Sequence, residues 1–142
     1  HRGVKTGPAI CYEGLYGDFY GGFVRRGAQF MAIISNDGWW GDTPGYKHLF
    51  TISRLRAIEH RRAIARSANT GMSGFISARG DIGETLGWEK RGVISAAVPL
   101  NSELTFYTRY GDYLGRIAEY LTLLCVLYYI AYRVKRENYL VK

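Results

Sequence analysis

Residues 30–35 read Phe-Met-Ala-Ile-Ile-Ser, an apolar run that ends in a serine. A short apolar run that is followed at once by turn residues is typical of a buried strand. The run leads into residues 36–45, where Asn-Asp-Gly, Gly-Asp and Pro-Gly pairs surround two tryptophans. The sequence therefore predicts a buried strand that ends in a loop with an unusually high aromatic content.

Further elements are expected on both sides of this strand. Upstream, residues 8–13 have the pattern of a short apolar strand, and the Gly-rich stretch 14–22 leads into a predicted helix. Downstream, apolar residues at near-helical spacing predict a helix from about residue 46 to about residue 62. More strands are expected at residues 63–68, 74–77 and 93–100, with a turn at residues 79–81. This order favours an α/β or α+β layered domain over residues 1–100.

The C-terminal part of the chain has a different pattern. Residues 101–113 are polar and aromatic without a clear period, and are expected to be a linker. Residues 114–132 are apolar apart from Arg116 and Glu119, and at about 1.5 Å per residue this run predicts one transmembrane helix. Only residues 120–132 are free of charge, and a run of that length is also typical of a buried core helix. Tyrosines in the run and basic residues in the tail, 133–142, favour a membrane helix with its C-terminus in the cytoplasm.

The composition fits a folded domain with a basic character. The chain has 142 residues, 47% of them hydrophobic, and a formal net charge of +7, which a membrane surface, nucleic acid or an acidic substrate could match. No zinc-finger spacing or nucleic-acid-binding motif is present, so a membrane is favoured over nucleic acid as the partner. Five arginines crowd one segment, and for the predicted helix in it a solvated face or a site for anionic lipid head groups is expected. They are Arg54, Arg56, Arg61, Arg62 and Arg66.

Cys11 is the candidate nucleophile. It stands near the end of the first predicted strand, just before the Gly-rich turn into a helix. A buried structural cysteine is one interpretation, because free cysteine is among the most buried residue types. At a sharp strand-to-helix turn, however, a side chain is exposed at the sheet edge, and backbone N–H groups there can stabilise a thiolate and a developing oxyanion. Glu13 disfavours a thiolate, so a cation is expected close to Cys11.

Histidines and the second cysteine offer other chemistry. His48 or His60 could serve as the base of a Cys/His dyad, although a packed or solvated histidine is the commoner outcome in a helix. Their spacing matches no usual ligand pattern, so no metal and no cofactor is expected. Cys11 and Cys125 cannot define a disulfide framework and are expected to be free thiols.

Trp39 and Trp40 form the second candidate site. In one interpretation the surrounding Asn and Asp residues satisfy the turn backbone, and both indole rings pack on the domain. In the other, the two tryptophans belong to a mobile loop beside the active site and hold an acyl chain. The sequence leaves both interpretations open.

Several linked motifs resemble those of the apolipoprotein N-acyltransferases, a family of the nitrilase, or carbon–nitrogen hydrolase, superfamily. They are Ile-Cys-Tyr-Glu at 10–13, Ser-Asn-Asp-Gly-Trp-Trp-Gly-Asp at 35–42, the arginine helix at 54–59, Arg-Ser-Ala-Asn-Thr-Gly at 66–71 and Thr-Arg-Tyr-Gly-Asp at 108–112. The resemblance implies the C-terminal part of an α-β-β-α sandwich on the periplasmic side of the bacterial inner membrane, followed by one membrane helix. It also implies a Glu–Lys–Cys triad.

In that family pattern Cys11 falls on the nucleophile, and Tyr12 on the residue whose N–H helps to form the oxyanion hole. Glu13 falls on a further carboxylate near the thiol. The resemblance implies that a phospholipid donates an acyl chain to the thiol as a thioester. The acceptor is then the α-amino group of the S-diacylglyceryl cysteine of an apolipoprotein.

The chain departs from the family pattern in two places. The triad Glu and Lys belong upstream of residue 1, so the chain is expected to be an inactive fragment by itself. Trp40 stands where most members of the family have Phe. Two other classes of function stay open: an amidase of the same superfamily, for which a C-terminal membrane helix would be unnecessary, and a non-enzymatic membrane-tethered module.

Overall fold

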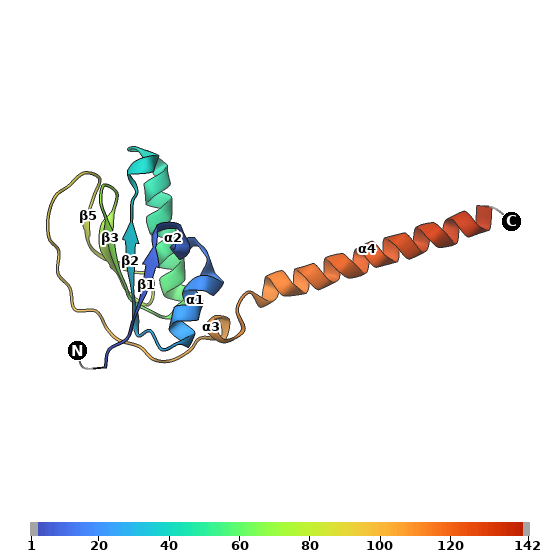
Figure 1. Cartoon of the computed structure of the whole chain (residues 1–142), viewed down its shortest axis with the longest axis horizontal. Helices are drawn as coiled ribbons and strands as arrows, with labels where there is room; N and C mark the ends of the chain where they lie inside the picture. The colour runs from blue at the N-terminus through green and yellow to red at the C-terminus, as the bar shows by residue number, and fades with distance from the viewer. Residues whose placement is uncertain (1–2, 141–142) are drawn as a thin grey trace. The chain divides into compact units, whose positions relative to one another are not determined.

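The computed structural model describes residues 3–140, and the chain forms two compact units, His1–Gly111 and Asp112–Lys142. The first unit is built on a five-stranded sheet in the order β1-β2-β3-β4-β5 (Figure 1). Its strands are β1 (Thr6–Ile10), β2 (Phe30–Ser35), β3 (Ile64–Ala68), β4 (Ser73–Ile76) and β5 (Ile82–Leu86). The first three strands are parallel and the last two are antiparallel. The predicted α/β class is confirmed, and the sheet is mixed.

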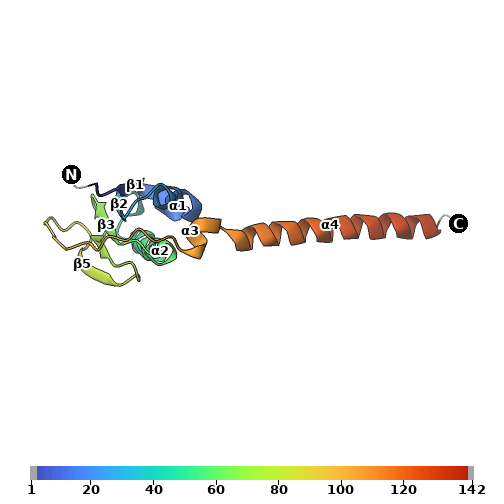
Figure 2. The same cartoon turned by 90° about the horizontal axis from the view of Figure 1, so that it is seen from below.

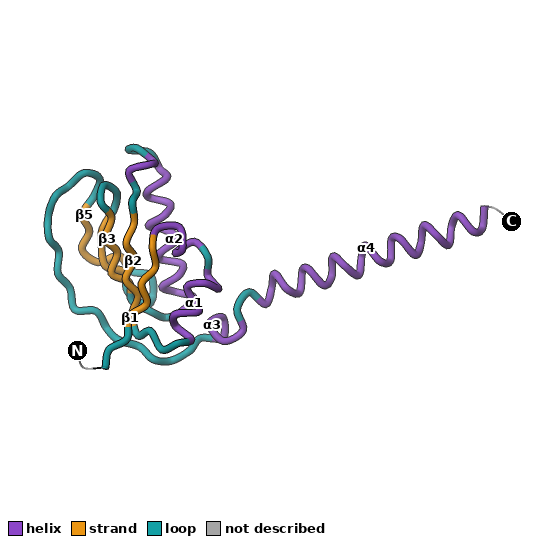
Figure 3. Tube along the Cα trace, in the orientation of Figure 1, coloured by secondary structure: helices purple, strands orange, loops and turns teal. Residues whose placement is uncertain are grey.

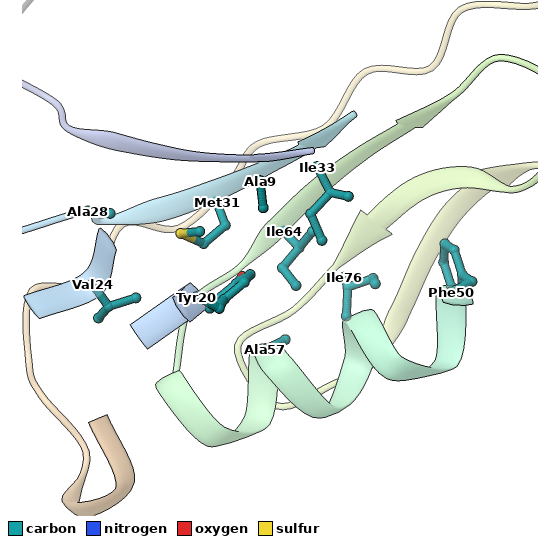
Figure 4. Close-up of a cluster of buried hydrophobic side chains, with 10 residues drawn as sticks. All are labelled: Ala9, Tyr20, Val24, Ala28, Met31, Ile33, Phe50, Ala57, Ile64 and Ile76. Atoms are coloured by element: carbon teal, nitrogen blue, oxygen red, sulfur yellow. The ribbon is translucent and has the colours of Figure 1, made fainter. Parts of the chain in front are cut away.

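Two helices cover one face of this sheet (Figure 2). Helix α1 (Gly17–Arg25) connects β1 to β2, and helix α2 (Pro44–His60) connects β2 to β3. Figure 4 shows the apolar core between the sheet and these helices. The core consists of Ala9, Tyr20, Val24, Ala28, Met31, Ile33, Phe50, Ala57, Ile64 and Ile76.

The other face of the sheet is apolar and open. Successive side chains of a strand point to opposite faces, so Ile10 and Ile34 point away from the core residues Ala9 and Ile33. Ile10 is 60% exposed and Ile34 is 59% exposed. An open apolar face of this kind is what one sheet of an α-β-β-α sandwich presents to the other sheet.

The strand predicted at residues 93–100 is wrong, and β5 was not predicted. Residues 93–100 pair with no strand of the described chain, and Val93 is 95% exposed (Figure 3). β5 instead forms a hairpin with β4 through the turn that the sequence did predict, where the backbone N–H of Ser77 donates to the carbonyl of Asp81. Polar and glycine residues within β5 hide the alternation that would indicate a strand. Residues 93–100 are apolar in sequence but form no strand pairing within the described chain.

Three of the five arginines of the arginine-rich segment are buried, and for these the expectation of a solvated or lipid-binding face is wrong, whereas Arg61 is exposed. Arg56, Arg62 and Arg66 are only 9%, 0% and 5% exposed. Arg62 donates from Nε to the carbonyl of Ala28 (2.7 Å) and from Nη1 to that of Glu103 (2.8 Å). Arg62 therefore links two segments that are far apart in the sequence.

The segment expected to be a linker contains helix α3 (Phe106–Tyr110), and its first part is tied to the first unit. Thr105 Oγ1 donates to the carbonyl of Glu59 at 2.6 Å, and Thr108 Oγ1 lies 2.8 Å from His60 Nδ1. His60 Nε2 lies 3.1 Å from the carbonyl of Gly17. Because that carbonyl can only accept, Nε2 carries the proton of the neutral ring and Nδ1 accepts from Thr108.

The second unit consists of helix α4 (Tyr113–Leu140). Within the described residues, its part Tyr113–Arg136 is the single helix that is long and apolar enough to cross a membrane, judged by length and composition. The predicted span 114–132 lies inside it. The helix continues into the basic tail, and the cytoplasmic position of that tail stays a prediction.

The buried histidine gives a prediction for the dependence of stability on pH. Burial, with a contribution from the charge of Arg56, lowers the pKa of His60 to about 4. The same ring titrates near 6.5 in an unfolded chain. Between these two pH values the unfolded state binds the proton more readily, so the free energy of unfolding should fall as the pH drops from about 6.5 to about 4. The loss should be at most about 1.4 kcal/mol per pH unit.

Denaturant titrations followed by tryptophan fluorescence at a series of pH values would measure this slope. His60→Gln should lose the part of the slope that lies between these pH values, whatever its stability at pH 7. If the free energy of unfolding depends on pH in the same way in both proteins, His60 is not the group that causes the slope.

Candidate active site

Cys11 sits at a sharp turn at the end of β1. The strand ends at Ile10, and Cys11 opens the 3₁₀ helix η1 (Cys11–Leu15). Its φ of 51° lies in the left-handed region, which costs a non-glycine residue about 1 to 2 kcal/mol. The thiol is neither fully buried nor fully exposed. The strand predicted to run through residue 13 thus stops early, and the turn lifts Cys11 out of the sheet.

Glu13 helps to close this turn. Its carboxylate oxygen Oε2 accepts from the backbone N–H of Ile10 at 2.7 Å. Hydrogen bonds to a carboxylate are stronger than those between neutral groups. The first contribution of Glu13 is therefore to hold the backbone on either side of Cys11, and its expected role as a carboxylate near the thiol stays a prediction.

Strand pairing brings Ser35 to the thiol. Ile10 pairs with Ile34 in the parallel register of β1 and β2, so the next residues, Cys11 and Ser35, are neighbours. Ser35 Oγ lies 3.7 Å from Cys11 Sγ and is also hydrogen-bonded to Asp37 Oδ1 at 2.5 Å. Ser35 is 6% exposed and Asp37 is fully buried.

A buried ion pair supports Ser35. Arg66 binds both carboxylate oxygens of Asp37 at 3.1 Å and also donates to the carbonyl of Met72 at 2.9 Å. The backbone N–H of Asp37 donates to Asn69 Oδ1 at 3.2 Å. At Gly71 a Cβ atom would stand 2.2 Å from Asp37 Oδ2, so the close approach of this loop requires glycine. The charges of Asp37 and Arg66 are thus paired and hydrogen-bonded.

The serine hydroxyl can serve either neighbour. It has one proton, so it can donate to the Asp37 carboxylate or to the sulfur, but not to both at once. The Asp37 carboxylate also accepts from the Arg66 guanidinium, and can release the serine proton without losing all its donors. When Cys11 ionises, the Ser35 hydroxyl is placed to donate to the thiolate.

Exposed aromatic side chains accompany the polar site. Tyr12, which follows Cys11, is 47% exposed, and its ring lies 6.5 Å from that of Trp40. Further along the chain, Tyr16 is 66% exposed and Phe19 is 46% exposed. Trp39 is 84% exposed. Accessible rings thus occur on η1 and at its end, at the start of α1, and in the loop after β2.

The two tryptophans differ in their surroundings. Trp40 packs against the backbone of Gly45, where a Cβ atom would come within 2.3 Å of the indole ring. Trp39 is mostly free, as its exposure shows. Packing therefore accounts for Trp40 in part, and Trp39 is the better candidate for contact with a substrate.

The histidines have other surroundings. Both ring nitrogens of His60 are engaged, by Thr108 and by the carbonyl of Gly17, so this side chain has no free nitrogen with which to serve as a base. His48 lies on the exposed side of α2. Among the residues that the structure describes, no group of three or more His, Cys, Asp and Glu could hold a metal ion.

The polar support of the thiol was missed as a site in the sequence, although its members stood in the quoted motifs. Ser35 ends an apolar strand, Asp37 follows that strand, and Arg66 interrupts the apolar run of the neighbouring strand β3. A charged residue inside a predicted buried strand, with an opposite charge just after the adjacent strand, was the available signal.

The chain matches the carbon–nitrogen hydrolase family over residues 1–104, and it belongs to that family. Its fold is that of the nitrilase superfamily. Saccharomyces cerevisiae Nit3, from branch 10 of that superfamily, superposes with a TM-score of 0.53 at 21% identity, over 61% of this chain and 34% of Nit3. The Caenorhabditis elegans NitFhit protein gives 0.52 at 23% identity, over 59% of this chain and 22% of that protein.

Among curated proteins, the chain is similar to apolipoprotein N-acyltransferases. The apolipoprotein N-acyltransferase of Chlorobaculum tepidum is 44% identical over 109 residues, which are 77% of this chain and 20% of that protein. The one of Bdellovibrio bacteriovorus is 36% identical over 127 residues, 87% of this chain and 22% of the relative. The chain is thus similar to apolipoprotein N-acyltransferases, and spans about a fifth of the length of these relatives.

Ser35 provides a test of the site that needs no substrate. Ser35→Ala removes the hydroxyl beside the sulfur, and iodoacetamide should then alkylate Cys11 more slowly at neutral pH, by roughly threefold or more, because a thiolate loses one hydrogen bond. Labelling of the Cys11 peptide, followed by mass spectrometry, measures the rate. Ser67→Ala, at an exposed position of β3, is the matched control. Equal rates for the two variants would exclude Ser35 from the site.

Proposed function

We propose that this chain supplies the nucleophile of an apolipoprotein N-acyltransferase. The observation that carries the proposal is the combination at Cys11: a left-handed turn that presents the thiol, a buried polar network beside it, and accessible aromatic rings on η1 and on the loop after β2. Similarity to the acyltransferases of Chlorobaculum tepidum and Bdellovibrio bacteriovorus supports the same activity.

In the first half of the proposed reaction, the Cys11 thiolate attacks the ester carbonyl of a phospholipid acyl chain. The bond from the acyl carbon to the glycerol oxygen breaks, the lysophospholipid oxygen takes up a proton, and a thioester forms on Cys11. The Tyr12 N–H would stabilise the oxyanion, and Glu13 would hold the turn during attack.

In the second half, the α-amino nitrogen of an S-diacylglyceryl cysteine on an apolipoprotein attacks the thioester. An amide forms, the nitrogen loses a proton, and the Cys11 thiolate leaves. The proton acceptors would be the Glu and Lys of the triad, which the family resemblance places in the part of the relatives that precedes this chain. Cys11 and Ser35 alone lack a base for either step.

The aromatic rings support a lipid substrate. Trp39 and Tyr12 offer apolar area that a water-soluble amide would not need, and an acyl chain can pack on such rings. Helix α4 has the length and composition of a membrane span, and basic residues near its end favour a cytoplasmic C-terminus. The catalytic unit would then work on the periplasmic side of the inner membrane.

Cys11→Ser, made in the complete protein that contains this chain, tests the nucleophile. Serine has about the same size but ionises far less readily, so transfer to a synthetic S-diacylglyceryl cysteine peptide should fall by at least roughly a hundredfold. The product is measured by mass spectrometry. Cys125→Ser should retain transfer. Substantial transfer by Cys11→Ser would show that another group is the nucleophile.

Replacement of the tryptophans separates substrate contact from packing. Trp39→Ala should impair transfer while the melting temperature hardly changes, because this ring is mostly in solvent. Trp40→Ala should lower the melting temperature as well, because that ring packs against Gly45. Normal turnover by Trp39→Ala would leave the exposed ring without a role in transfer.

A further inference from the structure

Two side chains of helix α2 are hydrogen-bonded to the backbone where η1 ends and α1 begins. Arg56 Nη1 donates to the carbonyl of Leu15, the last residue of η1, at 3.0 Å. One helical turn further along α2, His60 Nε2 donates to the carbonyl of Gly17, the first residue of α1, at 3.1 Å. Two side chains at i and i+4 thus bind the two ends of the connection between η1 and α1.

Stability alone is a poor reason for a guanidinium in this place. Arg56 is only 9% exposed, and its charge is met by Glu59 at 2.9 Å. Within residues 3–140, Arg56 Nε and Glu59 Oε2 are buried without a hydrogen-bond partner. A buried ion pair with unmet hydrogen bonds is often no more stabilising than apolar side chains of similar volume. It does, however, fix the position of what it binds.

Gly17 shows how closely the guanidinium approaches the backbone. A Cβ atom at this position would stand 2.7 Å from Arg56 Nη1 and 2.5 Å from Tyr107 Oη. On the same helix, a Cβ atom at Gly22 would meet nothing within 4 Å. The start of α1 is therefore shaped around Arg56, whereas Gly22 lies in open space.

The turn needs such support because Cys11 has a φ of 51°. A strained conformation persists only where the surrounding structure holds it. Glu13 holds the turn at its start, through the N–H of Ile10, and Arg56 holds it at its end, through the carbonyl of Leu15. We propose that Arg56, with His60 beside it, is a positioning residue for Cys11, acting through the backbone of Leu15 and Gly17. The inference rests on the proposed function only for the role of Cys11 as nucleophile.

The first test compares two arginines of α2 in the complete protein. Arg56→Lys keeps the charge but cannot reach both the Leu15 carbonyl and Glu59 with a planar fork. The rate of Cys11 alkylation and the kcat of acyl transfer should each fall roughly tenfold, with KM almost unchanged, because a misplaced nucleophile affects the chemical step. Arg54→Lys is the control: Arg54 Nε donates to the carbonyl of Gly80, away from η1, at 2.8 Å. This variant should lose stability without a change in Cys11 alkylation.

The second test perturbs the guanidinium without replacing it, and it decides the question if Arg56→Lys fails to fold. Gly17→Ala adds a methyl group against Arg56 Nη1 and Tyr107 Oη, and Gly22→Ala adds the same group where there is space. We expect slower alkylation of Cys11 in Gly17→Ala and the wild-type rate in Gly22→Ala, with both rates measured well below the melting temperature of either variant. Equal alkylation rates in Gly17→Ala and Gly22→Ala, or in Arg56→Lys and Arg54→Lys, would overturn the positioning role.

Alkylation keeps this inference separate from the proposed function. If the wild-type protein transfers no acyl chain, the proposed function fails, but the alkylation rates of the four variants still measure whether Arg56 positions Cys11. If transfer occurs and the paired variants do not differ in alkylation, the proposed function stands and the role of Arg56 does not.

Discussion

The ion pair between Asp37 and Arg66 joins the loop after β2 to the middle of β3. Both side chains are buried, so removal of either partner would leave an uncompensated charge, at a cost of roughly 3 to 5 kcal/mol. Ser35 is hydrogen-bonded to Asp37 and lies against Cys11. The ion pair therefore also fixes the position of the serine hydroxyl beside the thiol. The need for glycine at position 71 follows from this close packing.

Around this fixed point the site has two chemical characters. Its inside is polar: Ser35 lies beside the sulfur and is linked through Asp37 to Arg66. Its outside is aromatic, with Tyr12 and Trp39 accessible. A polar interior can stabilise charge that develops on sulfur and on an attacked carbonyl, and an aromatic exterior can accept an acyl chain. A site that is polar inside and aromatic outside suits a lipid ester as substrate better than a small soluble amide, which has no acyl chain to pack on the rings.

Local pattern was enough to predict part of the fold. The apolar run that became β2, the turn at residues 79–81, and the position of Cys11 at a strand end next to a turn all depend on neighbours in sequence, and the structure confirms them. The arginines of α2, of β3 and of the connection between them could not be placed in this way, because the sequence does not show whether water or distant carbonyl groups surround a guanidinium. Arg62, for example, binds the carbonyls of Ala28 and Glu103.

Similar limits apply to the segments at 93–100 and 101–111. An apolar run becomes a strand only where it pairs with another strand, and residues 93–100 pair with none in the described chain, although β1 and β5 each have one unpaired edge. The polar stretch after it has no period, yet Thr105 and Thr108 bind groups of α2 that lie more than forty residues earlier. Such contacts depend on the folded core and leave no periodic trace in the sequence.

The central claim is that Cys11 carries the acyl group, and one measurement addresses it directly. The complete protein is incubated with a phospholipid of defined acyl chain, without an acceptor, and is then digested and analysed by mass spectrometry. The peptide that contains Cys11 should be heavier by that acyl group and should return to its free mass after treatment with neutral hydroxylamine, which cleaves thioesters. A Cys11 peptide that gains no acyl mass, or an acyl group found on another residue, would contradict the account.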